Sequence, residues 1–533
     1  MRFLLLFLLL AAAAHASWQH GAHLRIHAET HEAAQAIAEQ LGVELLERLP
    51  TGQWIATDAD VSHPAVARIV PRDFDARFWS FRPTPPITHL DALRDVDPEW
   101  NLHALHVRDA WPVTNGSGSL VMVIDAGASL ANPDLVRADH TLAWDAIRQS
   151  GDVEPPAGID HGTSTTAMVA APANNFCGTG TAPGATLSVI RLLGPRGVLT
   201  TSAEAAALLH LPSGRTPDVL SLSIGPSDTG FIYAPLDDAL LTAFDTLEAR
   251  GTTVAWSIGN GRLNDDHALW DGAVSHPGVL AVAAVGHDGL PAYYTEPGGM
   301  AALAAPSSDH VQGVSAAVGS NGCNAFFGGT SAAAPQIAGI LALLATNRSL
   351  TIDDRYDALF QSANANRGAV AATVPFTANA AGMLHSVDVG FGIPDAADAL
   401  ARANHRSERW VARTVSVPLD AERSFLRSAV LTANVTEDAT VVAATARLGF
   451  EFGPYSMAQM TEISITSPSG TVAVVLGGRN RMYGMRSVHD LRLGTRAFHR
   501  EPARGVWSVT VRSMSPLSIG LDAGMLLDLR VVM

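Results

Sequence analysis

The middle of this chain alternates short apolar runs with longer stretches of small and apolar residues. Runs rich in Val, Ile and Leu, typical of strands buried on both faces of a parallel sheet, lie at 120–124, 186–192, 219–224, 253–258 and 279–285. Between and after them, helices are expected at 203–211, 236–250 and 334–345. The alternation predicts an α/β domain with a doubly wound parallel sheet over residues 95–402.

The pattern differs on both sides of this domain. From residue 409 to 533, short alternating segments dominate, and turn signals such as Pro468-Ser-Gly470 separate them. Strands at 462–466, 472–476 and 507–512 predict an all-β sandwich or jelly roll. Residues 17–94 form a smaller α+β segment with an expected amphipathic helix at 32–41. A chain of 533 residues is too long for one core, so several domains are expected.

The N-terminus resembles an export signal. Arg2 precedes an apolar run over 3–14, and Ala14-His15-Ala16 offers a cleavage site, so residues 1–16 are predicted to be removed. The alternative is a membrane anchor, but the run is too short to span a bilayer. We therefore expect a secreted or secretory-pathway protein, a monomer with no stable membrane anchor.

The composition excludes one class of partner. The net charge is −16, with charged residues at 16% and hydrophobic residues at 47%. Nucleic-acid binding needs a basic face, so no nucleic acid is expected. The negative charge is compatible with cationic substrates or bound metal cations.

Three segments place reactive side chains at strand ends or helix starts. Asp125 follows an apolar strand, His161 begins a small-residue helix after Asp160, and Ser331 lies in the sequence GTSAAAP at 329–335. Together they fit nucleophilic catalysis, in which Ser331 attacks a carbonyl, His161 takes its proton and Asp125 orients the imidazole. Taken singly, each residue has a structural explanation as a turn, a helix start or an N-cap.

A side-chain amide completes this candidate set. Asn260 follows the strand at 253–258 and could donate to a developing oxyanion together with the backbone N–H of Ser331. The alternative for Asn260-Gly261 is a plain turn. The order Asp125, His161, Ser331 is that of subtilisin and excludes the α/β-hydrolase order.

These motifs resemble the subtilisin superfamily, and within it the kexin and furin proprotein convertases. The closer resemblance rests on the segment at 223–230, on the positions of Cys177 and Cys323, and on 491–512 with Gly505-Val-Trp507. It implies a calcium-dependent serine endopeptidase with a propeptide at 17–94, a catalytic domain at 95–402 and a P domain at 409–533. It also implies that Cys177 and Cys323 form a disulfide; two free thiols are the alternative.

The resemblance assigns several acids. Asp228 and Asp271 match acids that line a pocket for a basic P1 residue, and a planar guanidinium favours Arg there. Glu204 matches an acid that favours a basic P4 residue. One calcium site would use Asp228, Asp266 and Glu296, and a second Asp97, Asp134 and Asn175. The alternative is a set of solvated loop acids.

The sequence also departs from the convertases. They usually carry a second acid directly after the catalytic Asp, which favours a basic P2 residue, but this chain has Ala126. The expected processing site agrees, because cleavage after Arg94 would place Leu93 at P2. The implied partners are proteins or peptides with exposed Arg, and the chain's own propeptide as inhibitor and chaperone. The competing hypotheses are a broad-specificity degradative subtilisin and an inactive relative that acts as a binding or chaperone module.

Overall fold

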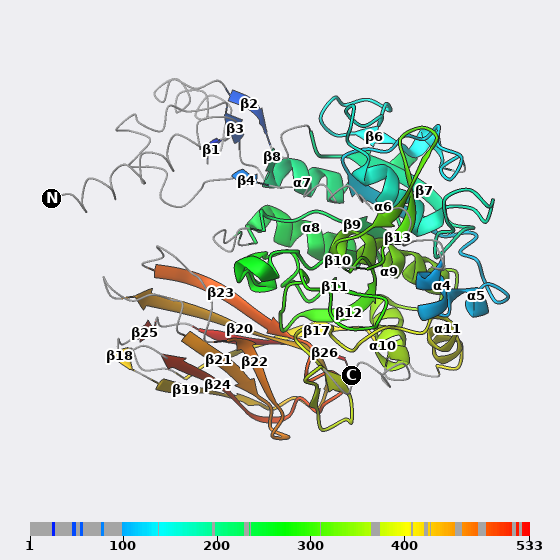
Figure 1. Ribbon diagram of the computed structural model, residues 1–533. Helices are drawn as coiled ribbons and strands as arrows, with labels where there is room; N and C mark the ends of the chain where they lie inside the picture. The colour runs from blue at the N-terminus through cyan, green and yellow to red at the C-terminus, as the bar shows by residue number, and fades with distance from the viewer. Residues whose placement is uncertain are drawn as a thin grey trace.

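A computed structural model describes four short strands before residue 99 and most of the chain from there to residue 532 (Figure 1). The helix expected at 32–41, the processing residue Arg94 and the predicted ligand Asp97 lie outside the described residues. After residue 99 the description omits 137, 195–197, 229–233, 235, 310, 364–373, 407–408, 421–424, 427, 453–460, 478–486, 514–518 and 522–524.

The centre of the molecule is a seven-stranded sheet in which all paired strands are parallel. Its order is β12-β11-β10-β9-β5-β7-β6. All five expected strands are present, which confirms the predicted parallel α/β sheet, and two edge strands were not expected. The strands are β5 (Leu120–Asp125), β6 (Trp144–Asp145), β7 (Thr186–Arg191), β9 (Val219–Leu222), β10 (Thr253–Ser257), β11 (Val279–Val285) and β12 (Ala301–Pro306).

The strand order reverses between β5 and β9. From β5 the chain goes to β6 and β7 on one side, whereas from β9 it goes on to β10, β11 and β12 on the other. A crevice at the carboxyl ends of the strands is expected at such a switch point, where open α/β sheets bind ligands. Asp125 ends β5, and Ser223 directly follows β9.

The central helix of the domain is α9 (Thr330–Ala345). Its Ala- and Leu-rich sequence leaves no polar face, and every residue of this helix except Ser331 is buried. The other helices are α4 (Trp100–Ala104), α5 (Val107–Ala110), α6 (His161–Ala170), α7 (Thr201–Leu208), α8 (Asp238–Ala249), α10 (Ile352–Ala363) and α11 (Ala396–Asn404), with 3-10 turns η2 (His140–Leu142), η3 (Pro212–Gly214), η4 (Arg262–Asn264) and η5 (Ala268–Trp270).

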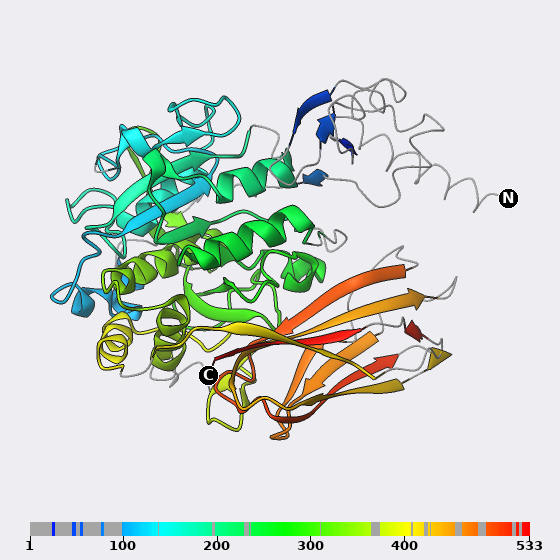
Figure 2. The same ribbon diagram turned by 180° about the vertical axis from the view of Figure 1, so that it is seen from behind.

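Two antiparallel sheets make up the C-terminal region, drawn from yellow through orange to red in Figures 1 and 2. Side chains of both sheets, such as Leu431, Trp507 and Leu527, share one core, which confirms the predicted sandwich. One sheet contains β17 (Arg413–Pro418), β18 (Phe425–Leu426), β20 (Thr440–Phe452), β23 (Ser487–Thr495), β25 (Ile519–Leu521) and β26 (Leu526–Val532); the other contains β19 (Ser428–Val435), β21 (Thr461–Thr466), β22 (Val472–Leu476) and β24 (Gly505–Ser513).

The remaining strands form small separate pairs and a three-stranded sheet. Strand β4 (Ala76–Phe78), from the N-terminal segment, pairs antiparallel with β8 (Val198–Thr200). The hairpin of β13 (Val314–Val318) and β14 (Gly322–Phe327) leads into α9. The others are β1 (Leu24–Ile26), β2 (Leu45–Arg48), β3 (Trp54–Ala56), β15 (Thr377–Ala378) and β16 (Leu384–His385). Within the part of the chain that the structure describes, no helix is both long and apolar enough to cross a bilayer.

Candidate active site

Asp125 and His161 form a hydrogen-bonded pair at the carboxyl end of the sheet. His161 Nδ1 lies 2.9 Å from Asp125 Oδ1 and 3.0 Å from Asp125 Oδ2. The Asp125 side chain is fully buried, whereas that of His161 is 17% exposed. A carboxylate in this position accepts the Nδ1 proton, so the other ring nitrogen, Nε2, is left for acid–base chemistry.

The glycine after His161 allows α6 to begin directly against β5. A Cβ atom at Gly162 would lie 2.0 Å from the carbonyl oxygen of Gly127 and 3.1 Å from Asp125 Cβ. Such distances are not tolerated, so a side chain at this position would push the helix away from the strand. Gly162 therefore permits the close approach of His161 to Asp125.

Ser331 lies in the first turn of α9, one residue after the helix begins. Its Oγ is 3.5 Å from the carbonyl oxygen of Ser223, and its own carbonyl accepts a hydrogen bond of 2.9 Å from Ser223 Oγ. Four residues earlier, Phe327 meets the His161 ring edge to face, with 5.9 Å between ring centroids and 70° between planes. The segment entering α9 thus packs against the imidazole, and the one residue of the helix that is not buried is the predicted nucleophile.

The amide of Asn260 is held in one orientation. Its carbonyl oxygen accepts hydrogen bonds from Thr330 N at 2.8 Å and Thr330 Oγ1 at 2.9 Å. These two bonds assign the oxygen, so the NH2 group occupies the other position of the amide. The residue next to Thr330 is Ser331, which brings the Asn260 side chain to the predicted nucleophile.

Three of the acids predicted to bind cations, Asp228, Asp266 and Glu296, lie beside Asn260 or its neighbour Gly261. Asp228 Oδ1 accepts a hydrogen bond of 3.2 Å from Asn260 N, and Glu296 Oε1 accepts one of 2.8 Å from Gly261 N. Burial, followed by the negative charges of Asp266 and Asp228, raises the pKa of Glu296 well above its ordinary value, and Asp271 adds to this effect. The side chains of these three acids and of Asp271 are each mostly buried. The cluster concentrates negative charge that a cation would neutralise.

The structure gives no preformed cage of acids. Among the residues it describes, no group of three or more His, Cys, Asp or Glu side chains has the arrangement of a metal site. A calcium ion takes six to eight oxygens and accepts backbone carbonyls and water among them. The carboxylate oxygens of Asp228, Asp266 and Glu296 are ligands that calcium accepts. A calcium site at these residues is therefore a proposal that rests on the chemistry of the donors.

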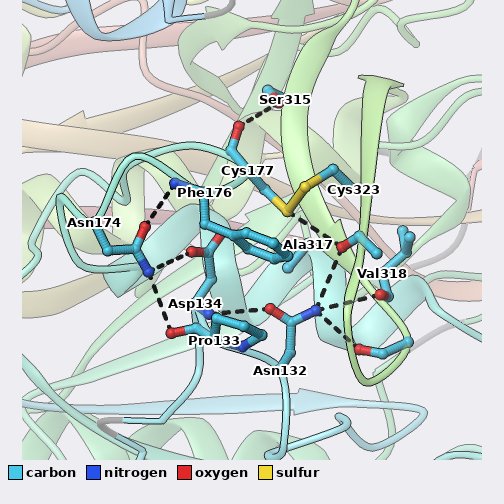
Figure 3. Close-up of a disulfide and its surroundings, with 12 residues drawn as sticks. Asn132, Pro133, Asp134, Asn174, Phe176, Cys177, Ser315, Ala317, Val318 and Cys323 are labelled. Atoms are coloured by element: carbon cyan, nitrogen blue, oxygen red, sulfur yellow. Dashed lines mark hydrogen bonds between the residues drawn. A yellow bond between two sulfur atoms is a disulfide. The ribbon is translucent and has the colours of Figure 1, made fainter.

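The residues predicted for the second calcium site differ in their exposure, and one of them, Asp97, lies outside the described residues. Asp134 is buried, and its Oδ2 has no hydrogen-bond partner. Its Oδ1 accepts a hydrogen bond of 2.9 Å from Asn174 Nδ2, while the neighbouring Asn175 is exposed (Figure 3). Burial raises the pKa of Asp134, and this exceeds the lowering by the bond from Asn174. Asn174, which the predicted set did not include, contacts Asp134, and the role of Asn175 as a calcium ligand stays a prediction.

Cys177 and Cys323 form the disulfide that the sequence resemblance implied (Figure 3). The bond ties the loop after α6 to β14, and β14 leads into α9. Around it, Asn132 Nδ2 donates to Gly319 O at 2.9 Å and Ser315 Oγ donates to Cys177 O. The disulfide therefore joins the segments that carry His161 and Ser331.

Glu204, the acid predicted to favour a basic P4 residue, lies on α7 and is fully buried. It is close in sequence to β8, the strand that pairs with β4. Its burial gives no open surface to a substrate side chain in this conformation, so its role stays a prediction.

The four candidate catalytic residues lie within a region that matches a known protein family. A model of the subtilase family, peptidase family S8, matches residues 116–389, which include Asp125, His161, Asn260 and Ser331. This chain belongs to the subtilase family. The match covers the central sheet and most of the helices around it.

Curated relatives of this subtilase are convertases of the kexin and furin type. It is 29% identical to Endoprotease aex-5 of Caenorhabditis elegans over 78% of this chain and 75% of that protein. It is 28% identical to Furin-1 of Xenopus laevis over 78% of this chain and 55% of that protein. Identity to Kexin of Saccharomyces cerevisiae is 31% over 49% of this chain. The chain thus spans about half the length of Furin-1 and 33% of Kexin.

Solved structures agree on the fold of this subtilase. The serine protease of Aeromonas sobria superposes with a TM-score of 0.72 at 20% identity, over 84% of this chain and 99% of that one. The same protease in complex with the chaperone ORF2 gives 0.69 at 20% identity, over 78% of this chain and 88% of that one. This similarity confirms the subtilisin-like fold that the sequence predicted.

Two side chains of the subtilase site were missed by sequence reasoning. Thr165 donates to Asp125 Oδ2 at 3.0 Å, and Phe327 contacts the ring of His161. Thr165 could have been found, because it lies four residues after His161 and shares its face of the helix. Phe327 could not, because its contact depends on how the β13–β14 hairpin folds back.

Proposed function

We propose that this subtilase is a serine endopeptidase that cleaves on the carboxyl side of basic residues, with Arg favoured, in protein precursors. The observation that carries the proposal is the hydrogen-bonded Asp125–His161 pair. Phe327, in the segment that enters α9, contacts the ring of His161, and Ser331 is the one residue of α9 that is not buried. The kexin and furin relatives support the choice of precursors as substrates.

Peptide-bond hydrolysis would proceed through an acyl-enzyme. Ser331 Oγ attacks the carbonyl carbon while His161 Nε2 takes its proton, and Asp125 stabilises the imidazolium that forms. The same proton then passes to the leaving amine. Water, deprotonated by His161, attacks the acyl-enzyme and releases the acid and Ser331.

Asn260 would stabilise the oxyanion of each tetrahedral intermediate. Its NH2 group is oriented by the two bonds from Thr330 to its carbonyl oxygen, and the backbone N–H of Ser331 is the second donor. One such donor contributes about 3 kcal/mol in the transition state.

The acids next to Asn260 support Arg at P1. Asp228 and Asp271 would pair with the guanidinium, since a buried guanidinium needs fixed opposite charge. Calcium, held by Asp228, Asp266 and Glu296, would neutralise the remaining charge and fix the loop at the pocket. A second calcium would use Asp134 with Asp97 and Asn175, where the unpartnered Asp134 Oδ2 supports a cation. Ala126 adds no charge at P2, so P2 is not restricted to basic residues.

The N-terminal segment would act as a propeptide. The antiparallel pairing of β4 with β8 supports this role, because the two strands form a small sheet that joins the N-terminal segment to the catalytic domain. We assign residues 1–16 to the export signal, 17–94 to the propeptide, 95–402 to the catalytic domain and 409–533 to the P domain. Self-cleavage after Arg94 in the secretory pathway would release the mature enzyme. N-terminal sequencing of the secreted protein should begin at Asp95; a start far from it contradicts this assignment.

A fluorophosphonate probe tests the proposed chemistry. We expect covalent labelling of the mature protein and no labelling of Ser331→Ala. Equal labelling of both proteins, or no labelling of the mature wild type, contradicts the proposal. The second result would favour an inactive binding module.

A further inference from the structure

Thr165 is placed to act on the Asp125–His161 pair from inside helix α6. It lies one turn after His161, and its Oγ1 donates to Asp125 Oδ2 at 3.0 Å. Both Thr165 and Asp125 have no exposed surface. A hydrogen bond from a hydroxyl to a buried carboxylate is stronger than one between neutral groups.

The hydroxyl of Thr165 has a second acceptor within reach, the carbonyl oxygen of Gly162 at 3.2 Å. That oxygen already accepts a hydrogen bond of 2.6 Å from Thr166 Oγ1. A hydroxyl carries a single proton, and the charged carboxylate is the stronger acceptor. The proton of Thr165 therefore goes to Asp125.

The other hydroxyls of this helix turn are used elsewhere. Thr163 Oγ1 accepts from Ser129 N at 3.0 Å, and Ser164 Oγ donates to Ala317 O at 2.8 Å. In the described part of the chain, Thr165 is the only side chain besides His161 with a recorded bond to Asp125. The backbone N–H of Ala126 supplies the remaining recorded bond, 2.7 Å to Oδ1.

We propose that Thr165 is a positioning residue that fixes the plane of the Asp125 carboxylate and limits how strongly this carboxylate holds the proton of His161. The inference rests on the proposed function, because it assigns Thr165 a role in the same acid–base pair. Thr165 does not touch the reacting atoms, so its effect passes through Asp125 to His161.

Removal of this hydrogen bond should make His161 more basic. Without the Thr165 donor, the negative charge of Asp125 is less dispersed and attracts the imidazolium more strongly. Two other ionisable side chains near the pair have hydrogen bonds to other partners. Asp160 accepts from Gly319 N at 2.9 Å, and Arg191, opposite Asp125 in the register, donates to Asp145 at 3.0 Å.

The test compares Thr165→Val and Thr165→Ser in the mature enzyme. Valine has nearly the same shape without the hydroxyl, and we expect about a tenfold loss of kcat with little change in KM. The acidic limb of the kcat/KM profile should move to higher pH by up to about one unit. Serine, which keeps the donor, should restore both values towards those of the wild type.

Two further variants keep the test decisive. Thr166→Val removes a hydroxyl from the same turn and should leave the acidic limb in place. Thr165→Cys keeps a weak donor and should give an intermediate limb, which is useful if the valine variant does not fold. If fluorophosphonate labels the wild type and the acidic limb of the kcat/KM profile does not move in Thr165→Val or Thr165→Cys, the inference is overturned. A wild type without labelling overturns the proposed function instead.

Discussion

Asp357 on α10 accepts a hydrogen bond of 2.9 Å from His499 Nε2, which belongs to the loop between β23 and β24. Arg500 adds bonds of 2.8 and 3.1 Å to the two carboxylate oxygens, and Arg406 donates to the same group. The Asp357 side chain is fully buried. This acid therefore joins the helical part of the molecule to the C-terminal sandwich.

We predict that Asp357→Asn weakens this junction. Removal of one member of a buried charge network costs about 3–5 kcal/mol, because the partner charges lose their compensation. Urea unfolding at neutral pH measures the loss. Asp438→Asn is the control, since Asp438 pairs with Arg504 on an exposed surface, and it should leave the unfolding midpoint unchanged.

The stabilisation by Asp357 should depend on pH. Burial alone would raise its pKa, but the bonds from His499 and Arg500 outweigh burial and hold the pKa well below its ordinary value of 3.8. A carboxyl group whose pKa is lower in the folded than in the unfolded protein stabilises the fold at pH values above its unfolded pKa. This stabilisation is lost as the pH falls from the unfolded pKa towards the folded pKa. The difference between wild type and Asp357→Asn should narrow below pH 4. A constant difference down to pH 2 would contradict the assignment.

Leu269 links the sandwich to the predicted P1 pocket. This residue of η5 is buried in the C-terminal core, two positions before Asp271. We predict that Leu269→Ala costs about 2–5 kcal/mol and also lowers the preference for Arg over Leu at P1. Unfolding curves and paired peptide substrates measure the two effects. Leu263→Ala, at a position that is 69% exposed, should change neither.

The disulfide should contribute strongly to stability. It joins residues 146 positions apart, and closing a loop of this length lowers the entropy of the unfolded chain by an amount worth about 5 kcal/mol. The double variant Cys177→Ser, Cys323→Ser should therefore unfold at a clearly lower temperature than the wild type. An unchanged Tm would contradict a stabilising role for the disulfide.

Calcium removal should lower both activity and thermal stability. A chelator should reduce the Tm, and added calcium should restore it, because the ion would neutralise the acids around Glu296. Glu296→Gln should weaken this response and leave Ser331 accessible to a fluorophosphonate. Identical melting curves with and without chelator would argue against a calcium site in this cluster.

The local pattern of the sequence was enough to predict much of the fold. Apolar runs identified β5, β7, β9, β10 and β11, because strands buried on both faces need continuous apolar residues. The two-residue strand β6 carries too little pattern to be recognised. The strand β12, Ala301–Pro306, contains mostly Ala, which has little preference for strands.

Candidate site residues could be named from the sequence where motifs are short and contiguous. The sequence around Ser331 and the pair His161-Gly162 indicated the candidate catalytic residues. Contacts between distant segments carry no such signal. The packing of Leu269 in the sandwich and of Phe327 against His161 depends on how the chain folds back, which local periodicity does not record.

The central proposal is that the hydroxyl of Ser331, activated by His161, cleaves after Arg because Asp228 and Asp271 would bind the guanidinium at P1. The most direct test measures kcat/KM of the mature enzyme on two peptides that differ only in having Arg or Leu at P1, and repeats it with Asp271→Asn. We predict a strong preference for Arg in the wild type and a much weaker one in the variant. Equal rates for the two peptides in the wild type would contradict the account.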